Sequence, residues 1–164
     1  MNKNIIVTGG LGFIGSNLID LLINKKYSVI NLDKVSYSSN FYNLKEYKSH
    51  TKYKFIKCDL NSKKILNILL KYKPVCIFNL AAETHVDRSI DGPKNFINSN
   101  VLGTFNLLEA FKIFSFKYKS KLIHISTDEV YGDILNGRSD EKYSYKPSSP
   151  YAASKAAAVH LVYS

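Results

Sequence analysis

Tyr151 and Lys155 stand four residues apart at the start of a predicted helix that runs from Ser149 to the end of the chain. This spacing places the two side chains on one face of the helix. A free tyrosine, with a pKa of about 10, is a poor base at neutral pH, but a neighbouring ammonium, together with a positively charged redox cofactor, would lower that pKa by stabilising the phenolate. Such a tyrosine can take a proton from a substrate hydroxyl while hydride leaves the same carbon. Because Tyr-x-x-x-Lys is also common on ordinary helix surfaces, the pair predicts chemistry only where a redox site accompanies it.

A second cluster of reactive side chains, Thr127-Asp128-Glu129, follows an apolar run at Lys121–Ser126. Two adjacent carboxylates usually mark a solvated loop. Catalytic groups, however, collect at the carboxyl ends of strands in a parallel sheet, and two acids there can divide general-acid and general-base work. Spacing alone leaves both interpretations open.

A glycine-rich turn near the N-terminus has the spacing of a cradle for a dinucleotide. Gly10, Gly12 and Gly15 satisfy G-x-G-x-x-G, and Gly9 precedes them. Positions without side chains let the backbone turn tightly and let a pyrophosphate approach a helix N-terminus, whose N–H groups and dipole favour negative charge. The turn therefore predicts a phosphate-binding loop.

Asp33 closes the second apolar run, roughly twenty residues after the glycines, where a ribose contact is expected. A carboxylate there can accept hydrogen bonds from both ribose hydroxyls and repel a 2′-phosphate. The sequence therefore predicts NAD in preference to NADP, although Lys34 beside Asp33 weakens that preference.

These residues lie on an alternation of strands and helices. The predicted strands are Asn4–Thr8, Ser28–Asp33, Lys54–Lys57, Val75–Leu80 and Lys121–Ser126. The predicted helices are Gly12–Asn24, Ser62–Lys71, Pro93–Lys117 and a last one from Ser149. Such alternation predicts an α/β fold with a doubly wound parallel sheet, a Rossmann-like NAD-binding domain. The two irregular stretches, Val35–Thr51 and Gly132–Pro150, both follow strand ends, where ligands bind in such sheets.

The 164 residues are enough for one domain with its own core, so we expect residues 1–164 to form a single domain. The closing segment from Ala156 to Ser164 contains no Gly, Pro or other signal of a helix end. We therefore expect the domain to be incomplete at its C-terminus and to stop before a substrate-binding subdomain.

Composition excludes several classes of protein. The chain is 45% hydrophobic and 22% charged, which is ordinary for a globular protein. No apolar run is long enough to cross a bilayer and the N-terminus lacks the pattern of a signal peptide, so the cytoplasm is the expected location and no membrane partner is expected. The four histidines show no metal-ligand spacing, so no metal is expected. Cys58 and Cys76 show no C-x-x-C spacing and are expected to be buried free thiols.

The net charge of +10 raises the question of nucleic-acid binding. The lysines are spread through turns and polar helix faces and form no single arm, and no basic–aromatic motif of an RNA-binding sheet is present. Nucleic acid is therefore not an expected partner. A basic surface still favours anionic small molecules such as nucleotides.

With these motifs together, the chain resembles the extended short-chain dehydrogenase/reductase family along its whole length, and within it the 4,6-dehydratases of nucleotide sugars. The more specific matches are Ala81–Ile90, Thr127–Asp133 and Pro147–Tyr151. Related epimerases and decarboxylases share the glycines and the Tyr-Lys pair but generally lack an Asp-Glu couple in this place.

The resemblance implies a reaction that is redox-neutral overall, on a nucleotide sugar expected to be dTDP-glucose. It implies that Tyr151 removes the proton from O4 of the sugar while NAD takes hydride from C4, with Thr127 bound to that hydroxyl. It further implies that Glu129 removes the C5 proton, that Asp128 protonates the departing C6 hydroxyl, and that NADH returns hydride to C6. The product would be a 4-keto-6-deoxy sugar.

The resemblance also implies a set of site residues. The implied catalytic residues are Thr127, Asp128, Glu129, Tyr151 and Lys155, and Thr84 joins Thr127 as a substrate contact. The implied cofactor contacts are Gly9, Gly12, Phe13, Ile14, Gly15, Asp33, Lys34, Val35, Ser36, Asp59, Leu60, Leu80, Ala81, Ala82, Glu83, Thr84, Ser99, Tyr151 and Lys155. Asp59 and Leu60 would flank the adenine, and Asp59 could cap a helix at the same time.

Alternatives remain open at this stage. The chain could belong to another NAD-dependent enzyme of the same fold, such as a UDP-glucose 4,6-dehydratase, an epimerase or a decarboxylase, or could be a non-catalytic NAD-binding fragment. The resemblance also implies that a full-length enzyme is a homodimer, built on the helix at Pro93–Lys117 and the helix of the Tyr-Lys pair. Val35-Ser36-Tyr37-Ser38-Ser39-Asn40 departs from the family's usual run at this point, which bears on the ribose-side contacts.

Overall fold

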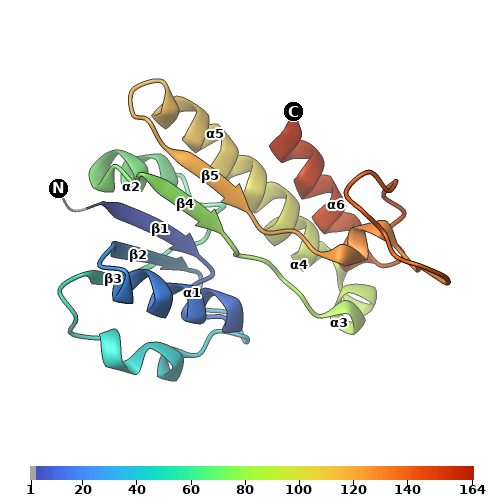
Figure 1. Ribbon diagram of the computed structural model, residues 1–164, viewed down its shortest axis with the longest axis horizontal. Helices are drawn as coiled ribbons and strands as arrows, with labels where there is room; N and C mark the ends of the chain where they lie inside the picture. The colour runs from blue at the N-terminus through green and yellow to red at the C-terminus, as the bar shows by residue number, and fades with distance from the viewer. Residues whose placement is uncertain (1–2) are drawn as a thin grey trace. The chain divides into compact units, whose positions relative to one another are not determined.

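The computed structural model describes residues 3–164 and divides them into two compact units (Figure 1). The first unit contains the chain up to residue 81 together with residues 106–125. The second contains residues 82–105 and 126–164. The first carries the glycine-rich turn, and the second carries the acidic couple and the Tyr-Lys pair.

The first unit is built on a sheet of five parallel strands. The strands are β1 (Asn4–Thr8), β2 (Ser28–Asp33), β3 (Tyr53–Lys57), β4 (Cys76–Asn79) and β5 (Lys121–His124). Their order in the sheet is β3-β2-β1-β4-β5, and β1 pairs in parallel with both β2 and β4. The strand order therefore reverses beside β1, which is the place where doubly wound sheets bind ligands at their carboxyl ends. The predicted fold class is confirmed.

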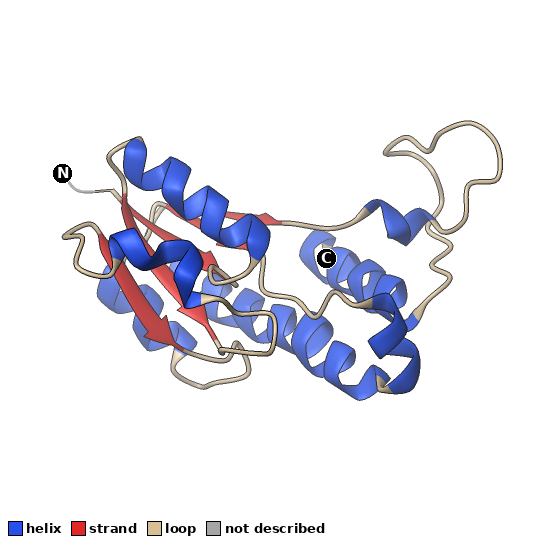
Figure 2. Cartoon of the chain, turned by 90° about the horizontal axis from the view of Figure 1, so that it is seen from below, coloured by secondary structure: helices blue, strands red, loops and turns tan. Residues whose placement is uncertain are grey.

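Helices cover both faces of this sheet because the strand side chains alternate between the faces. On one face, Ile5 and Val7 of β1 pack in a cluster with Ile19 of α1 (Phe13–Asn24) and Leu44 of the short 3-10 helix η1 (Phe41–Tyr47). On the opposite face, Ile6 belongs to a cluster with residues of α2 (Ile65–Tyr72) and of α5 (Gly103–Ser115). Figure 2 shows the strands between these two layers of helices.

The second unit is helical. It contains α3 (Val86–Asp91), α4 (Pro93–Phe96), the π-helical turn η2 (Ile97–Leu102), the 3-10 turn η3 (Asp128–Tyr131) and α6 (Pro150–Tyr163). Ser149 caps α6, since its hydroxyl accepts a hydrogen bond from the amide of Ala152. α6 packs against α3, α4, η2 and η3, which brings the Tyr-Lys helix beside the segment that carries the acidic couple.

The predicted elements differ from the observed ones mainly at their ends. The helix predicted at Pro93–Lys117 is α4, η2 and α5 in succession and ends at Ser115. The helix predicted at Ser62–Lys71 begins at Ile65, and the fifth strand ends at His124 instead of Ser126. η1, α3 and η3 were not predicted, because each is too short for an apolar period to show. No helix among residues 3–164 is long and apolar enough to cross a membrane.

Candidate active site

The glycine-rich turn closes tightly between β1 and α1. Gly9 has a φ of +69° and its amide donates to the carbonyl of Leu32. A Cβ at Gly9 would lie 2.8 Å from Cα of Ala81, and one at Gly15 would lie 2.3 Å from the carbonyl oxygen of Gly9. Neither position has room for a side chain, so both glycines are required by the close approach of backbone to backbone.

The N-terminus of α1 is open to an anion. Gly12 is the N-cap and contributes no side-chain hydrogen bond to the first turn. Phe13 and Ile14, the first two helical residues, are 83% and 60% exposed. The amides and the dipole of this helix end are therefore available to an anion, as the predicted phosphate-binding loop requires.

Asp33 at the end of β2 holds the loops around it. Its Oδ2 accepts from the amide of Leu11 at 3.0 Å, and its Oδ1 accepts from the amide of Val35 at 2.8 Å and from the hydroxyl of Ser39 at 2.9 Å. The side chain is only 6% exposed. A carboxylate has about four acceptor positions, so these three bonds leave one position, on Oδ2, for the ribose contact that the sequence predicts.

The segment after β2 is strained. Val35 has a φ of +63°, a left-handed conformation that is a genuine outlier for a β-branched residue. The hydrogen bond from its amide to Asp33 holds it there, and the amide of Ser36 is bound by the hydroxyl of Ser39. Strain of this kind concentrates at ligand-binding segments, which supports the predicted role of residues 34–36.

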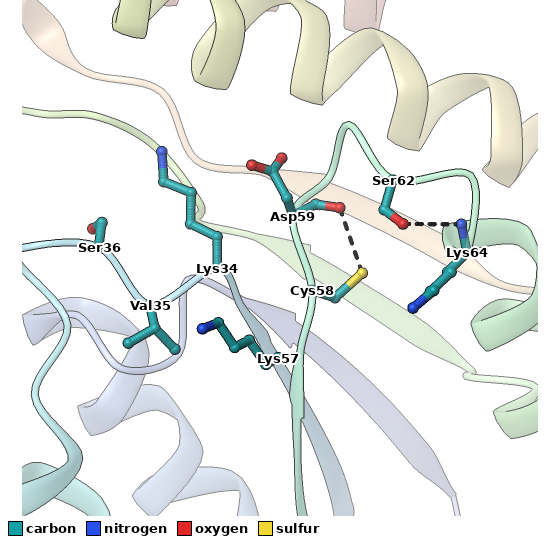
Figure 3. Close-up of a pocket in the computed structure, with 8 residues that line it drawn as sticks. All are labelled: Lys34, Val35, Ser36, Lys57, Cys58, Asp59, Ser62 and Lys64. Carbon is teal, nitrogen blue, oxygen red and sulfur yellow. Dashed lines mark hydrogen bonds between the residues drawn. The ribbon is translucent and has the colours of Figure 1, made fainter.

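A pocket of about 490 Å³ opens beside this segment, within the first unit (Figure 3). Its lining residues come from the segments after β2 and β3 and from the turn before α2, and they are Lys34, Val35, Ser36, Lys57, Cys58, Asp59, Ser62 and Lys64. The predicted contacts Lys34, Val35, Ser36 and Asp59 are therefore brought together. The side chain of Leu60 is in the hydrophobic core.

Asp59 does not cap α2. The N-cap of that helix is Lys64, and the Asp59 carboxylate instead accepts from the amide of Asn61 at 2.8 Å. The helix-cap interpretation of Asp59 is therefore wrong, because α2 starts later than the sequence predicts.

Thr8, which sequence reasoning missed, fixes the end of β4. Its hydroxyl accepts from the amides of Leu80 and Ala81 at 3.2 and 3.1 Å and donates to Oδ1 of Asn79 at 2.7 Å. These bonds hold the predicted contacts Leu80 and Ala81 against the glycine turn. A threonine directly after the apolar run Ile5-Ile6-Val7 was the signal available in the sequence, and the structure buries it fully.

In the second unit, Asn100 holds together two segments that are distant in the sequence. Its side chain accepts from the amide of Glu83 at 2.8 Å and donates to the carbonyl of Glu83 at 3.0 Å and to the hydroxyl of Ser154 at 2.8 Å. The Ser154 hydroxyl in turn donates to the carbonyl of Tyr151. Asn100 therefore positions both the predicted contacts at 82–84 and the first turn of α6, a role that no sequence pattern indicated.

Asn100 lies in the π-helical turn η2, as does the predicted cofactor contact Ser99. A π turn adds a residue to the helix and is frequent at functional sites.

Thr84, the predicted substrate and cofactor contact, is exposed at the start of the segment that leads into α3.

Tyr151 is buried at the start of α6. Its amide donates to the hydroxyl of Ser89 at 3.1 Å, and its ring makes an edge contact with Phe96 at 6.3 Å between centroids. Burial is the largest cause of a raised pKa at its phenol. A hydrogen bond with Thr127 lowers this pKa, whereas the charges of Glu129 and Asp128 raise it. The lowered pKa predicted from the sequence depends on the positive nicotinamide ring as well as on Lys155, and in the protein alone desolvation and two carboxylates raise the pKa of Tyr151.

Lys155 is also buried, with 4% of its surface exposed. Burial lowers the pKa of its ammonium from 10.5 to about 8. The i, i+4 spacing that predicts one shared helix face is therefore accompanied by shared burial, which surface pairs of this type lack.

The acidic couple lies on η3, directly after the segment that leaves β5. Thr127 is the N-cap, and its hydroxyl lies 3.3 Å from the amide of Glu129 and 3.3 Å from Oδ1 of Asp128. Both carboxylates are exposed and act electrostatically on Tyr151. The structure thus brings Thr127, Asp128, Glu129 and Tyr151 together as one acid–base cluster.

Contacts between the two ends of the loop at residues 132–146, which follows η3, hold these ends together. The amide of Lys146 donates to the carbonyl of Val130 at 3.0 Å, and a Cβ at Gly132 would lie 2.0 Å from the carbonyl oxygen of Lys146. Tyr131 makes an edge contact with Tyr145 at 5.3 Å. These contacts hold η3, and with it the acidic couple, in place.

Comparison with known proteins agrees with this arrangement. A family profile described as GDP-mannose 4,6 dehydratase matches residues 6–164. A dTDP-glucose 4,6-dehydratase from Haemophilus influenzae is 48% identical over an alignment that covers 97% of this chain and 50% of that protein. The chain therefore spans about half the length of this curated relative.

Solved structures give the same picture. DesIV, a dTDP-glucose 4,6-dehydratase from Streptomyces venezuelae solved with NAD bound, matches with a TM-score of 0.90 at 36% identity, covering 97% of this chain and 50% of that chain. A UDP-glucose 4-epimerase from Thermus thermophilus in complex with NAD matches with a TM-score of 0.86 at 31% identity, covering 98% of this chain and 50% of that chain.

Proposed function

The chain belongs to the GDP-mannose 4,6 dehydratase family, and from that premise we propose that it supplies the cofactor-binding and acid–base residues of a dTDP-glucose 4,6-dehydratase. The observation that carries the proposal is the adjacent pair Asp128 and Glu129, whose charges act on the phenol of Tyr151. Removal and return of hydride alone need one acid–base tyrosine, whereas elimination of water needs a further base and a further acid. The relative from Haemophilus influenzae is named for this dehydration.

The first unit fits NAD as cofactor. The glycine turn leaves no room for a side chain, and the uncapped α1 N-terminus suits a pyrophosphate. Asp33 keeps one acceptor position for the ribose, and the adjacent pocket is large enough for part of an adenosine. NAD, when bound, supplies a hydride acceptor for oxidation and, once reduced, a hydride donor for reduction.

In the oxidation step, Tyr151 takes the proton from the C4 hydroxyl of the glucose. Thr127 hydrogen-bonds the same oxygen and Lys155, as an ammonium, stabilises the phenolate. Ser89 and Asn100 hold the first turn of α6, so the phenol stays at a fixed position when the proton moves.

In the elimination step, the C4 ketone acidifies the hydrogen on C5. Glu129 takes that proton, and Asp128 delivers a proton to the C6 hydroxyl, which leaves as water. One side chain gains the proton that the other gives up, so this step leaves the number of protons on the chain unchanged. Hydride delivered to C6 and a proton returned to C5 complete the 4-keto-6-deoxy sugar.

The similarity to a UDP-glucose 4-epimerase supports a second candidate function. An epimerase would use Tyr151 and Lys155 in the same way but would not need the acidic couple. Variants of that couple therefore separate the two candidates.

Two further features of the proposed enzyme rest on the exposed surface and the cysteines. Leu102 and Phe105, both in the second unit, are 45% and 44% exposed. These exposed apolar side chains fit a homodimer contact. Cys58 and Cys76 are free thiols, which suits a reducing cytoplasm.

Activity is tested in a chimera in which this chain is continued by the C-terminal half of the Haemophilus influenzae relative. Tyr151→Phe is expected to abolish NADH formation from dTDP-glucose. Asp128→Asn with Glu129→Gln is expected to permit C4 oxidation but to stall elimination, so that NADH absorbance accumulates.

The chain offers matched controls for both variants. Tyr143→Phe removes an exposed tyrosine hydroxyl, and Asp140→Asn with Glu141→Gln neutralises another adjacent pair of exposed acids. Both controls should leave turnover unchanged. If the Asp128 and Glu129 double variant forms the 4-keto-6-deoxy product at the normal rate, the dehydratase assignment is wrong and the epimerase candidate gains.

A further inference from the structure

The amino ends of the five parallel strands form one edge of the first unit, and the glycine-rich turn lies at the opposite edge (Figure 1). Backbone hydrogen bonds join the segments that lead into neighbouring strands. The amide of Ser28 donates to the carbonyl of Lys3 at 3.2 Å, and the amide of Val29 donates to the carbonyl of Lys52 at 2.7 Å. The amide of Lys121 donates to the carbonyl of Val75 at 3.2 Å. Segments that are far apart in the sequence therefore lie side by side at this edge.

Nine lysines precede or open the five strands at this edge, and we call them the amino-edge cluster. They are Lys3, Lys25, Lys26, Lys52, Lys71, Lys73, Lys117, Lys119 and Lys121. All of them except Lys52 are exposed. The Nζ of Lys73 lies 5.3 Å from the centre of the Tyr118 ring, and the Nζ of Lys117 lies 5.8 Å from the same ring. The sequence shows no basic arm, but the fold gathers these scattered lysines at one place.

Little negative charge is available to offset the amino-edge cluster. The five acidic residues of the first unit are Asp20, Asp33, Glu46, Asp59 and Glu109. The stretches that hold all of the cluster except Lys3 contain no acidic residue, and they are residues 21–32, 47–58, 60–81 and 110–125. The C-terminal ends of α1, α2 and α5 also lie at this edge, because these helices lead into β2, β4 and β5. Each helix end carries about half a negative charge, so the three together offset only about one and a half of the positive charges.

The residue types at this edge fit an anionic lipid surface better than a nucleic acid. All the cations of the cluster are lysines, and the two arginines of the chain, Arg88 and Arg138, belong to the second unit. The planar fork of arginine suits nucleic-acid recognition, whereas the ammonium of lysine acts as a compact point charge. Phe116, directly before Lys117, is 85% exposed, and Val75 is 39% exposed. Exposed apolar side chains among lysines are typical of surfaces that lie in the headgroup layer of a membrane.

We propose that the amino-edge cluster docks the protein on the surface of a membrane that contains anionic lipids. The ammonium groups bind the phosphate and carboxylate groups of the lipid heads, while Phe116 enters the headgroup layer. The sequence analysis expects no membrane partner because no apolar run could cross a bilayer, but docking on a surface needs no such run. The glycine-rich turn and the pocket of Figure 3 lie at the carboxyl edge of the sheet, so docking leaves both uncovered. The inference does not depend on the proposed function.

Sedimentation of the purified chain with lipid vesicles tests the inference. The chain should bind phosphatidylcholine vesicles that contain about 30% phosphatidylserine at least about tenfold more tightly than vesicles of phosphatidylcholine alone. The binding should weaken with added salt, because it is electrostatic. This comparison uses the unmodified chain, so it decides the matter even if a variant does not fold.

Charge-matched variants locate the binding surface. The edge variant replaces by glutamine three exposed lysines from three segments of the cluster, Lys3, Lys71 and Lys119. The control variant replaces by glutamine three exposed lysines outside the cluster, Lys63, Lys94 and Lys142. Both lose the same net charge, but the edge variant should bind the anionic vesicles about tenfold or more weakly and the control variant should bind them much as the unmodified chain does. Phe116→Asn should weaken vesicle binding by about threefold or more.

Three outcomes would overturn the inference. The first is equal binding of the unmodified chain to both kinds of vesicle, or binding to neither. The second is an equal loss of vesicle binding in the edge and control variants. The third is tighter binding to duplex DNA than to the anionic vesicles at the same salt concentration, which would indicate a nucleic acid as the partner.

Discussion

Lys155 carries its charge where water hardly reaches it. Its folded-state pKa, about 8, lies below the ordinary 10.5, so between these values the unfolded chain holds a proton that the folded chain has released. The free energy of unfolding therefore rises with pH through this window, and below pH 8 the full desolvation cost of the ammonium is present. The burial of Lys155 therefore lowers the stability of the fold at neutral pH.

Lys155→Met should stabilise the fold at pH 7 by about 1–3 kcal/mol, because a buried charge is replaced by an apolar chain of similar length. It should also remove the rise in stability between pH 8 and 10. Urea denaturation at several pH values measures both effects. Lys112→Met, at an exposed lysine, should show neither, and an unchanged pH slope in Lys155→Met would contradict the assignment.

The acidic couple should control the pH dependence of oxidation. The base form of Tyr151 becomes more populated as pH rises. Because the charges of Asp128 and Glu129 raise the pKa of Tyr151, this change occurs at a higher pH than it would without them. In the chimera, the rate of NADH formation should therefore increase with pH. In the Asp128→Asn, Glu129→Gln variant that rise should occur at lower pH, measured by stopped-flow absorbance. A rise at the same pH in both proteins would show that the couple does not act on Tyr151.

The spacing of Tyr151 and Lys155 predicts their shared helix face, but the direction of the tyrosine's pKa shift was not predictable. It depends on burial by Ser89 and Phe96 and on charges at positions 128 and 129, none of which lies near Tyr151 in the sequence. The spacing of residues predicts which face of a helix their side chains share. It does not predict which side chains of other segments pack against that face.

At the scale of elements, η2 and α6 are joined through one side chain. Asn100→Ala would leave the amide and carbonyl of Glu83 without their present partner in a buried place, at a cost of about 1–3 kcal/mol for each group. We expect a clear loss of stability in urea denaturation and weaker NAD binding. Asn95→Ala, at an exposed position of α4, is the matched control and should change neither. Equal stability of the two variants would refute the role given to Asn100.

The end of α2 offers a test of backbone strain. Lys73 is the C-cap with a φ of +45°, a left-handed conformation that glycine adopts without penalty. Lys73→Gly should therefore stabilise the chain by about 0.5–1 kcal/mol. Lys71→Gly, two residues earlier and inside the helix, should destabilise it by a similar amount. Thermal denaturation distinguishes the two signs, and destabilisation by both substitutions would contradict the strain argument.

Strands and long helices were predictable because their apolar patterns extend over several residues. All five strands and α1, α2 and α6 were identified with shifts only at their ends, whereas the single helix predicted at Pro93–Lys117 is α4, η2 and α5 in succession. The turns η1, α3 and η3 are held by particular contacts, such as the Thr127 cap on η3, and not by a repeated pattern. Two of these missed elements, α3 and η3, belong to the unit that carries the acid–base cluster.

At the scale of the whole molecule, the chain has its motifs divided between two units. Glycine spacing and strand alternation made the first unit predictable, because a parallel sheet binds phosphates at one known edge. The positions of Asn100, Ser89 and Thr8 in the site were not predictable, since their roles come from hydrogen bonds across 17 to 73 residues of sequence.

The polypeptide of 164 residues is not expected to turn over dTDP-glucose by itself, although its implied catalytic residues are all present. The related dehydratase is twice as long, and the energy that binds the substrate holds its carbon in position for hydride transfer. A displacement of about 1 Å can reduce the rate by about a hundredfold. We therefore expect NAD binding but no product from the polypeptide alone, and product from the chimera with the Haemophilus influenzae half. Chromatographic analysis of dTDP-sugars after incubation measures both. Formation of the 4-keto-6-deoxy product by the monodisperse polypeptide alone would refute this prediction.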